Sequence, residues 1–324
     1  MKTLFLTLAW FASMFGAAVA QERVARVGVL SWQDAGAYHL ATSSAFVDGL
    51  RSEGFIEGQN LLLLRRSASN DPDKFKPLAR ELAAAKVDVF FAPATPMAGA
   101  AWAASRNTPI VIATVLDPIA LKFIDSLARP GTRVTGVTSM NDELTLKRLQ
   151  LLAEMVPGLK RVGVVIDTAM ANACKQEIEH TEKAAKRLGL TLVMAHVDQP
   201  SGLDAAMRKL VEAKVQAVTG TLLSTRNDLE AEQAQAALRH QLPSMFELEA
   251  AVQHGGLMSY GPDFAAIFRR AGQYTGKILK GGQPAEMAVE QPREFQLVLN
   301  LKTARALGLT VPQTIRLRAD KIIE

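Results

Sequence analysis

The chain has 324 residues, of which 48% are hydrophobic and 21% are charged, and its formal net charge is +5 at pH 7. These values indicate an ordinary globular protein of about two domains, and no low-complexity or Pro-rich linker divides the chain. Lys and Arg alternate with Asp and Glu along the expected helices, as in EIEHTEKAAKRLG, and no basic run occurs. The composition therefore argues against a nucleic-acid-binding protein.

The first twenty residues, MKTLFLTLAWFASMFGAAVA, predict a secretory signal peptide. A single Lys precedes an apolar run, and Ala18-Val19-Ala20 forms an A-x-A cleavage site. A short membrane anchor is the alternative, but the apolar run falls short of the ~20 residues that a membrane span requires. The mature chain should be exported, and its single cysteine, Cys174, permits no intramolecular disulfide.

Short β-branched runs alternate with helical stretches along the first part of the mature chain. The expected strands are ARVGVLS, NLLLLRRSA, VDVFFAPAT and PIVIATV, with helices over LATSSAFVDGLRSEGF, over PDKFKPLARELAAAK and through Trp102. Continuous apolar runs between amphipathic helices predict a parallel sheet covered on both faces. We therefore expect a doubly wound α/β lobe.

The same order of strands and helices recurs from Arg161, with RVGVVIDT, TLVMAHV, VQAVTGTLLST and LPSMFEL as strands. Val27-Gly28-Val29 matches Val162-Gly163-Val164, and Thr108-Pro109-Ile110 matches Leu242-Pro243-Ser244 at nearly the same offset. This duplication predicts a second, similar lobe.

The C-terminal part predicts one helix, PDFAAIFRRAGQYTGKILKGG, that completes the first lobe, and then a strand and a short helix that complete the second. The expected fold class is α/β, with two doubly wound parallel-sheet lobes joined by three crossovers. The expected divisions are a signal peptide at 1–20, a first lobe at 24–137 plus 259–288, and a second lobe at 138–258 plus 289–324.

In an open parallel sheet, ligands bind outside the carboxyl ends of the strands, so the residues that follow each strand are the candidates for a site. The candidate ligand-binding residues are Ser31, Trp32, Thr95, Pro96, Asp117, Ser139, Thr168, Ser224, Glu247 and Tyr260.

These candidates divide by the chemistry of their side chains. Trp32 and Tyr260 are expected to stack on a ring or an alkyl chain. Three hydroxyl residues are expected to contact a carboxylate or a hydroxyl group, namely Thr95, Ser139 and Ser224. Asp117 and Glu247 are expected to contact a cationic group.

Three of these assignments have a purely structural alternative. Thr95 and Pro96 read as the N-cap and the first residue of a helix, although such a helix start can also hold a ligand carboxylate. Asp117 before Pro118 reads as a second cap, and Trp32 can equally pack under the loop that follows it. Both interpretations stay open for each of the three.

The motifs of nucleotide-binding loops, of serine hydrolases and of zinc proteases are absent from the sequence, and the five His residues are scattered. We therefore expect no catalytic residue, no metal and no cofactor. Two lobes, export and the lack of catalytic groups favour a protein that closes on a ligand.

Four segments carry a resemblance to a known family: SLARPGTRVTGVTS, ATPMAGAAWAASRNTPIVIATVLDPIA, GGLMSYGPDF and the tail from KILKGGQPAEMAVEQPREFQ onward. Together they resemble ABC-transporter substrate-binding proteins of the tryptophan/tyrosine-uptake-like type, which have the type I periplasmic binding protein fold. The resemblance implies that Thr95 and Pro96 face the ligand and that Asp117 faces the cleft as a partner for an α-ammonium group.

The sequence therefore predicts a periplasmic solute-binding component of an ABC importer. It would bind an amino acid or a related aromatic or carboxylic acid between the lobes by hinge closure, and deliver it to a permease in the inner membrane. One alternative is a ligand-sensing receptor module for a signalling partner. Another is an exported enzyme that uses the same cleft, for which Glu247 or Asp167 would be the base although no partner is visible in the sequence.

Overall fold

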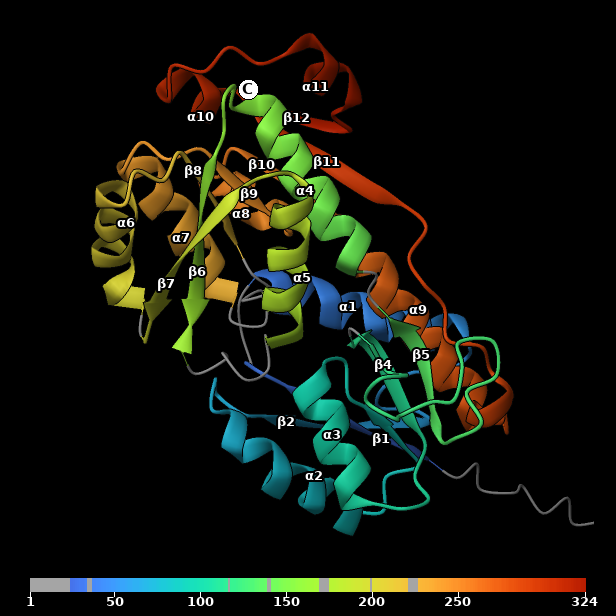
Figure 1. Cartoon of the computed structure of the whole chain (residues 1–324). Coiled ribbons are helices and arrows are strands. Elements are labelled where there is room, and N and C mark those ends of the chain that lie inside the picture. The colour runs from blue at the N-terminus through green and yellow to red at the C-terminus, as the bar shows by residue number, and fades with distance from the viewer. Residues whose placement is uncertain are drawn as a thin grey trace, which may run out of the picture.

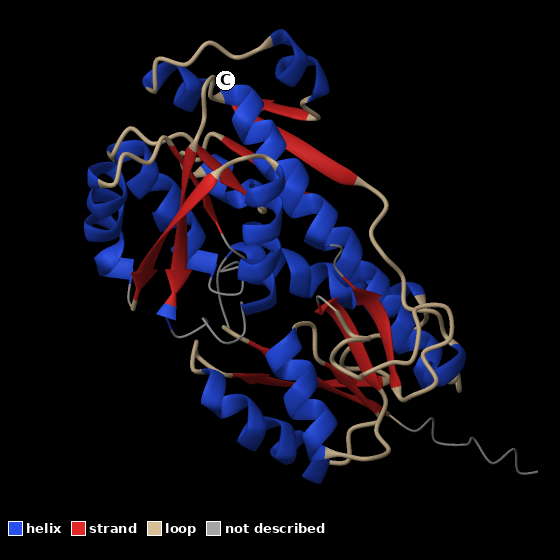
Figure 2. Cartoon of the chain, in the orientation of Figure 1, coloured by secondary structure: helices blue, strands red, loops and turns tan. Residues whose placement is uncertain are grey.

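The computed structural model describes residues 24–33, 37–115, 117–138, 141–168, 175–198, 200–220 and 227–324, which form two α/β lobes (Figures 1 and 2). The expected signal peptide lies outside the described residues, as do Ser139, Cys174 and Ser224. None of the described helices combines the length and the apolar character that crossing a membrane requires.

The first lobe is built on a five-stranded sheet in the order β2-β1-β3-β4-β5, and all of its pairings are parallel. The strands are β1 (Ala25–Ser31), β2 (Leu61–Ser67), β3 (Val89–Phe91), β4 (Ile110–Val115) and β5 (Val134–Thr138). The helices are α1 (Ala37–Ser52), α2 (Phe75–Ala84), α3 (Thr95–Ala104) and, from the C-terminal part, α9 (Phe264–Leu279), with the short 3-10 helix η1 (Pro72–Lys74) before α2.

The two faces of this sheet are covered by different helix pairs. Phe90 packs in a cluster with side chains of α2 and α3, whereas Val89 and Phe91 pack in a second cluster with side chains of α1 and α9. Successive side chains of a strand point to opposite faces, so a sheet covered on both faces needs apolar residues at every position. This explains why its strands read as continuous apolar runs.

The second lobe is built on a seven-stranded sheet in the order β12-β11-β10-β9-β8-β6-β7. The strands are β6 (Arg161–Asp167), β7 (Thr191–Val197), β8 (Ala217–Gly220), β9 (Ser244–Phe246), β10 (Met258–Pro262), β11 (Phe295–Asn300) and β12 (Lys321–Ile323). The helices are α4 (Asn141–Met155), α5 (Lys175–Arg187), α6 (Leu203–Glu212), α7 (Asn227–Arg239), α8 (Glu249–Gln253), α10 (Leu301–Ala306) and α11 (Gln313–Arg318).

The duplication read from the sequence is present in the fold. The order β7-β6-β8-β9-β10 repeats the order β2-β1-β3-β4-β5. The two Pro residues of the repeat occupy equivalent places, since the Pro109 carbonyl accepts the Phe90 N–H and the Pro243 carbonyl accepts the Val218 N–H, both at 2.8 Å. The predicted fold class of two doubly wound lobes is therefore confirmed.

The second sheet differs from the expectation in one pairing, because β10 and β11 are antiparallel. The reason lies in the path of the chain. It leaves the second lobe after β10 to form α9 in the first lobe, and it returns as β11. Two neighbouring strands that carry the chain out of a lobe and back into it must run in opposite directions.

The three crossovers lie between β5 and α4, between β10 and α9, and between Glu290 and β11. The boundary expected at residue 259 is wrong because it falls inside β10, which pairs with β11 along its whole length. The boundary expected at residue 289 is also early. Val289 and Glu290 hydrogen-bond to Leu127 and Gly136 of the first lobe, so the third crossover starts after Glu290.

Helix α9 returns to the first lobe by packing closely against α1 (Figure 1). Gly49 of α1 and Gly272 of α9 lie at the contact. A Cβ atom on Gly272 would overlap the carbonyl oxygen of Phe46, and one on Gly49 would overlap the carbonyl oxygen of Arg269. The helix backbones can approach this closely only because both positions lack a side chain.

We expect Gly272→Ala to lower the free energy of unfolding by about 1–3 kcal/mol, because the new methyl group forces the two helices apart. Gly99→Ala in α3 is the matched control, since nothing lies within 4 Å of its added Cβ. That change should raise stability by up to about 1 kcal/mol through helix propensity. Urea unfolding followed by circular dichroism measures both, and equal effects of the two substitutions would contradict the close packing.

Candidate functional site

The carboxyl ends of the strands in each lobe are turned toward the other lobe. β5 ends where the chain passes to the second lobe, and β1, β3 and β4 run parallel to it. β10 ends where the chain passes to the first lobe, and β6, β8 and β9 run parallel to it. The residues that follow these strands therefore lie on the two facing edges, where ligands of parallel sheets bind.

At this edge of the first lobe, a small cavity of about 60 Å³ is mostly apolar. Its lining includes Ser31, Trp32, Pro93, Met97, Thr114 and Phe268. Ligand pockets usually enclose about 300–1,000 Å³. This cavity is therefore smaller than a typical ligand pocket.

The Trp32 side chain forms one wall of this cavity and is only 5% exposed. Its ring meets the ring of Phe75 edge to face, with centroids 4.7 Å apart. Among the described residues, its buried indole Nε1–H has no hydrogen-bond acceptor. Trp32 therefore packs in the core, as the structural alternative expected, and also offers one unused donor at the cavity wall.

The start of α3 is displaced by one residue from the expected position. Ala94, with extended backbone dihedrals, is the N-cap, so Thr95 is the first helical residue and Pro96 the second. Pro is tolerated there because its missing N–H has no intrahelical acceptor. Thr95 is therefore not the capping residue that the sequence predicted, although it stays half-buried at the facing edge.

Asp117 has a structural role in the described chain. Its Oδ1 accepts the Ala120 N–H at 2.9 Å, and its carbonyl accepts the Leu121 N–H. This is the capping geometry that the sequence offered as an alternative. The side chain is half-buried. One of its carboxylate oxygens, Oδ1, is occupied by the hydrogen bond within the turn.

In the second lobe, Glu247 directly follows β9 and is 6% exposed. Its Oε1 lies 3.4 Å from Arg148 Nη1 on α4. Arg148 also donates to the Tyr260 carbonyl at 3.4 Å and to the Thr145 hydroxyl at 3.3 Å. Burial raises the pKa of Glu247, and the charge of Arg148 opposes that shift.

Tyr260 and Thr168 lie apart from this pair. The Tyr260 ring packs with the core of the second lobe, 6.1 Å from the ring of Phe295, whereas Trp32 belongs to another cluster. Burial and the carboxylate of Asp320 raise the pKa of the Tyr260 hydroxyl. Thr168 is exposed after β6. The structure does not bring Tyr260 and Trp32 together as two stacking partners.

Three residues beside Glu247 were not among the sequence candidates: Arg148, Glu230 and Gln233. Glu230 and Gln233 lie three residues apart on α7. The signal was present in the sequence, because the apolar face of this helix consists mainly of Ala residues such as Ala234 and Ala237. Small side chains leave room for polar ones to be enclosed.

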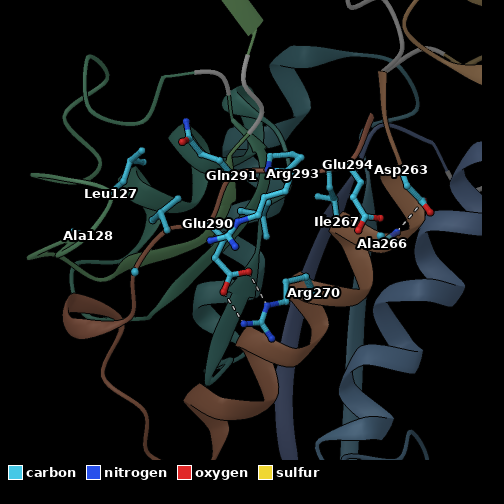
Figure 3. Close-up of a pocket in the computed structure, with 14 residues that line it drawn as sticks. Leu127, Ala128, Asp263, Ala266, Ile267, Arg270, Glu290, Gln291, Arg293 and Glu294 are labelled. Atoms are coloured by element: carbon cyan, nitrogen blue, oxygen red, sulfur yellow. Dashed lines mark hydrogen bonds and ion pairs between the residues drawn. The ribbon is translucent and has the colours of Figure 1, made fainter. Parts of the chain in front are cut away.

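A larger groove of about 770 Å³ lies elsewhere, beside the crossovers (Figure 3). It is bordered by the start of α9 and by the chain that follows η5 (Pro284–Glu286). Arg270 holds both carboxylate oxygens of Glu290, at 2.6 and 2.8 Å, and Asp263 caps α9 by accepting the Ala266 N–H. The groove lies at the crossovers and not at the strand ends of β1, β3 and β4.

No group of three His, Cys, Asp or Glu residues that could hold a metal ion occurs among the residues that the structure describes.

Comparison with known proteins gives consistent results. Residues 28–323 match the family described as ABC transporter substrate binding protein. The tyrosine-binding protein of Clostridioides difficile strain R20291 is 26% identical over 281 residues, which cover 86% of this chain and 78% of that protein.

Two solved structures are similar over nearly the whole chain. An ABC domain in complex with L-Trp from Streptococcus pneumonia is 25% identical, with a TM-score of 0.82, and covers 92% of this chain and 99% of that one. A ligand-free, open structure of a substrate binding protein with adhesive properties from Clostridium difficile is 24% identical, with a TM-score of 0.67, and covers 93% and 99%.

The capping role of Asp117 leads to a first prediction for this site. Asp117→Ala should lower the free energy of unfolding by about 1 kcal/mol, whereas Asp117→Asn should change it little, because Asn caps as well as Asp does. Denaturant titration of both variants measures this. Equal losses for Asn and Ala would show that the charge of Asp117, and not its cap, is what stabilises the fold.

The ion pair between Arg270 and Glu290 leads to a second prediction. Arg270 holds the pKa of Glu290 below its usual value. The stabilisation is therefore complete above the unfolded-state pKa of about 4.3, and it is lost as the pH falls through the lower folded-state pKa. Both side chains are more than a third exposed, so Glu290→Gln should cost no more than about 1 kcal/mol at pH 7.

This cost should disappear in acid, where the wild-type carboxylate is also protonated. Urea titrations across the pH range measure the difference, with the exposed Glu286→Gln in the same segment as the control. A difference between wild type and Glu290→Gln that persists unchanged at low pH would contradict an electrostatic origin.

Proposed function

The chain belongs to the family of ABC transporter substrate-binding proteins, and on this basis we propose that it binds an aromatic amino acid or a related carboxylic acid between its lobes. In this proposal the closed, loaded protein delivers the ligand to a permease in the inner membrane. The mature protein acts in the periplasm after removal of the expected signal peptide. Its fold is the type I periplasmic binding protein fold.

The observation that carries this proposal is the chemistry of the two facing edges. The first lobe contributes an apolar cavity with the Trp32 ring in its wall, and the second contributes the buried Glu247 and Arg148. An aromatic amino acid combines an apolar ring with a charged backbone. A pocket with one apolar and one polar side suits such a ligand.

The printed names of two relatives support the same ligand class. One is a tyrosine-binding protein, and another was solved in complex with L-Trp. Each is only about a quarter identical to this chain, so the choice among aromatic amino acids depends on the side chains of this cleft.

The arrangement of the lobes supports a mechanism of closure. One cluster of buried apolar side chains includes Trp32 and Met97 of the first lobe and Leu203 and Leu229 of the second. The TM-score is higher for the complex with L-Trp than for the ligand-free, open structure, at nearly equal identity and coverage. Both observations support a closed arrangement of this chain.

We expect native mass spectrometry of residues 21–324, purified without denaturation, to detect a bound small molecule or an empty protein that accepts one. L-Tryptophan, L-tyrosine and L-phenylalanine should then be tested by calorimetry and thermal shift. A ligand at about 100 times its Kd stabilises the folded state by about 2.7 kcal/mol, which raises the melting temperature by several degrees. Small-angle scattering should show a more compact protein if ligand drives closure.

The outcomes distinguish the proposal from its rivals. A ligand recovered unchanged after prolonged incubation supports a binding protein, whereas conversion of the ligand would support an exported enzyme. Binding without any change in compactness would weaken the hinge mechanism. No binding of any aromatic amino acid or related acid would overturn the ligand class and leave the family membership unaffected.

A further inference from the structure

Four polar side chains are enclosed together where β9 ends and α7 begins. Glu230 is 2% exposed, Gln233 is fully buried, and Glu247 and Arg148 are 6% and 4% exposed. Glu230 Oε1 accepts a long hydrogen bond of 3.5 Å from the Leu248 N–H. Two carboxyl groups therefore share the surroundings of one guanidinium.

Much of the hydrogen-bonding capacity of this group is unused. Within the described part of the chain, neither amide atom of Gln233 has a hydrogen-bond partner, and neither do Glu230 Oε2 or Glu247 Oε2. Glu247 Oε1 has no hydrogen bond either, but it lies 3.4 Å from Arg148 Nη1 in an ion pair. The Gln233 Oε1 lies 3.9 Å from the place that a Cβ on Gly220 would occupy, at the end of β8. Buried polar groups are normally paired, and a fully buried amide with neither atom bonded is rare.

The charges are also unbalanced. Arg148 is ion-paired with the Glu247 carboxylate, and a negative charge on Glu230 would have to share the same guanidinium. Burial, with the nearby Glu247 as a second cause, raises the pKa of Glu230 to about 8. In this enclosed arrangement at neutral pH, Glu230 therefore holds a proton, and a cation that entered the group would displace it.

The group lies at the meeting of the two lobes. Leu248, whose N–H binds Glu230, packs its side chain in the first lobe's cluster with Phe264 and Phe268. Helix α1 of the first lobe contacts α7. The carboxyl ends of β8 and β9 are on the facing edge of the second lobe, and Glu247 directly follows β9 at that edge.

We propose that Glu230, Glu247 and Gln233 form the subsite that binds the ammonium group of the ligand, an inference that rests on the proposed function. An ammonium group has three N–H donors, and the two carboxylates and the Gln233 Oε1 supply three acceptors. The Gln233 Nε2 then remains as a donor to the ligand's carboxylate. This assigns the ammonium to the second lobe instead of to Asp117. Asp117 Oδ1 accepts a backbone N–H at 2.9 Å, whereas the bond that Glu230 accepts is 3.5 Å long.

The other charged groups around α7 do not replace Glu230 in this role. Several have partners of their own: Asp204 pairs with Arg239 and His240, Glu249 with Lys321, Asp48 with Arg51, and His39 of α1 contacts the Ser43 hydroxyl. Glu232, Arg208, Lys209 and Glu212 are exposed. Burial also raises the pKa of Glu247, but this carboxylate is ion-paired with Arg148, which opposes that shift. A proton exchanged on binding is therefore assigned to Glu230.

The test compares L-tryptophan and L-tyrosine with indole-3-propionate and 3-(4-hydroxyphenyl)propionate, which lack the amino group. Titration calorimetry gives affinity, and repeating it at pH 7 in phosphate and in Tris gives the number of protons released. Glu230→Gln is the main variant, because Gln matches the shape of the protonated carboxyl. Glu232→Gln, which makes the same change on the exposed side of the same helix, is the control.

We expect the wild type to prefer the amino acids to their analogues and to release close to one proton on binding them. Glu230→Gln should bind the amino acids about 10- to 100-fold more weakly, bind the analogues nearly as well as the wild type, and release no proton. Glu232→Gln should match the wild type in its affinity for the amino acids, its affinity for the analogues and the number of protons released. Gln233→Met should also weaken amino-acid binding without lowering the melting temperature, because it removes an unpaired buried amide.

The contrary outcomes separate this inference from the proposed function. If the wild type binds amino acids and analogues equally well, or if Glu230→Gln retains wild-type affinity and proton release, the function stands and the subsite is overturned. If the wild type binds neither the amino acids nor the analogues, the proposed function is overturned together with this inference.

Discussion

The path of the chain between the lobes determines which edge of each sheet faces the other lobe. A parallel sheet places all of its strand ends at one edge, and a chain that leaves a lobe from the end of β5 or β10 must have that edge turned toward the other lobe. The loops after the remaining parallel strands then share one interface. The chain returns to the first lobe as α9, which completes that lobe. The position of α9 depends on its close approach to α1 at Gly49 and Gly272.

The two facing edges are chemically different although the lobes are duplicates. In the first lobe the residues at the strand ends pack into an apolar cavity, and the polar Asp117 is occupied by its turn. In the second lobe the equivalent region encloses carboxylates and an amide against Arg148. A duplication that supplied two copies of one scaffold has thus produced one side suited to a ring and one suited to charge.

Much of the fold was predictable from the sequence because it follows from local patterns of apolar and polar residues. Continuous apolar strands between amphipathic helices specify a sheet covered on both faces, and the repeated Val-Gly-Val and Pro positions reveal the duplication. The arrangement of the strands at the crossovers was harder to predict from the sequence. Residues 259–262 look like a loop with Gly and Pro, yet they form part of β10 because β11 pairs with them from elsewhere in the chain.

The candidate site was predictable only in part, for a related reason. Rules about strand ends locate Trp32 and Glu247, since these follow a strand directly. Glu230 and Gln233 reach the same place from a helix, and their burial depends on which face of α7 meets the sheet. A helix rich in Glu, Gln and Ala has the composition of a solvated surface. Only the packing of α7 against β8 and β9 shows that two of its polar residues point inward.

The enclosed polar group also bears on how closure could depend on ligand. Unpaired buried donors and acceptors cost free energy in a closed form that holds no ligand. A ligand that supplies the missing partners removes this cost only in the closed form. The resulting difference in affinity between the two forms is the quantity that drives a population shift. The ion pair of Glu290 with Arg270 and its bridge to Val137 hold the start of the third crossover on the first lobe.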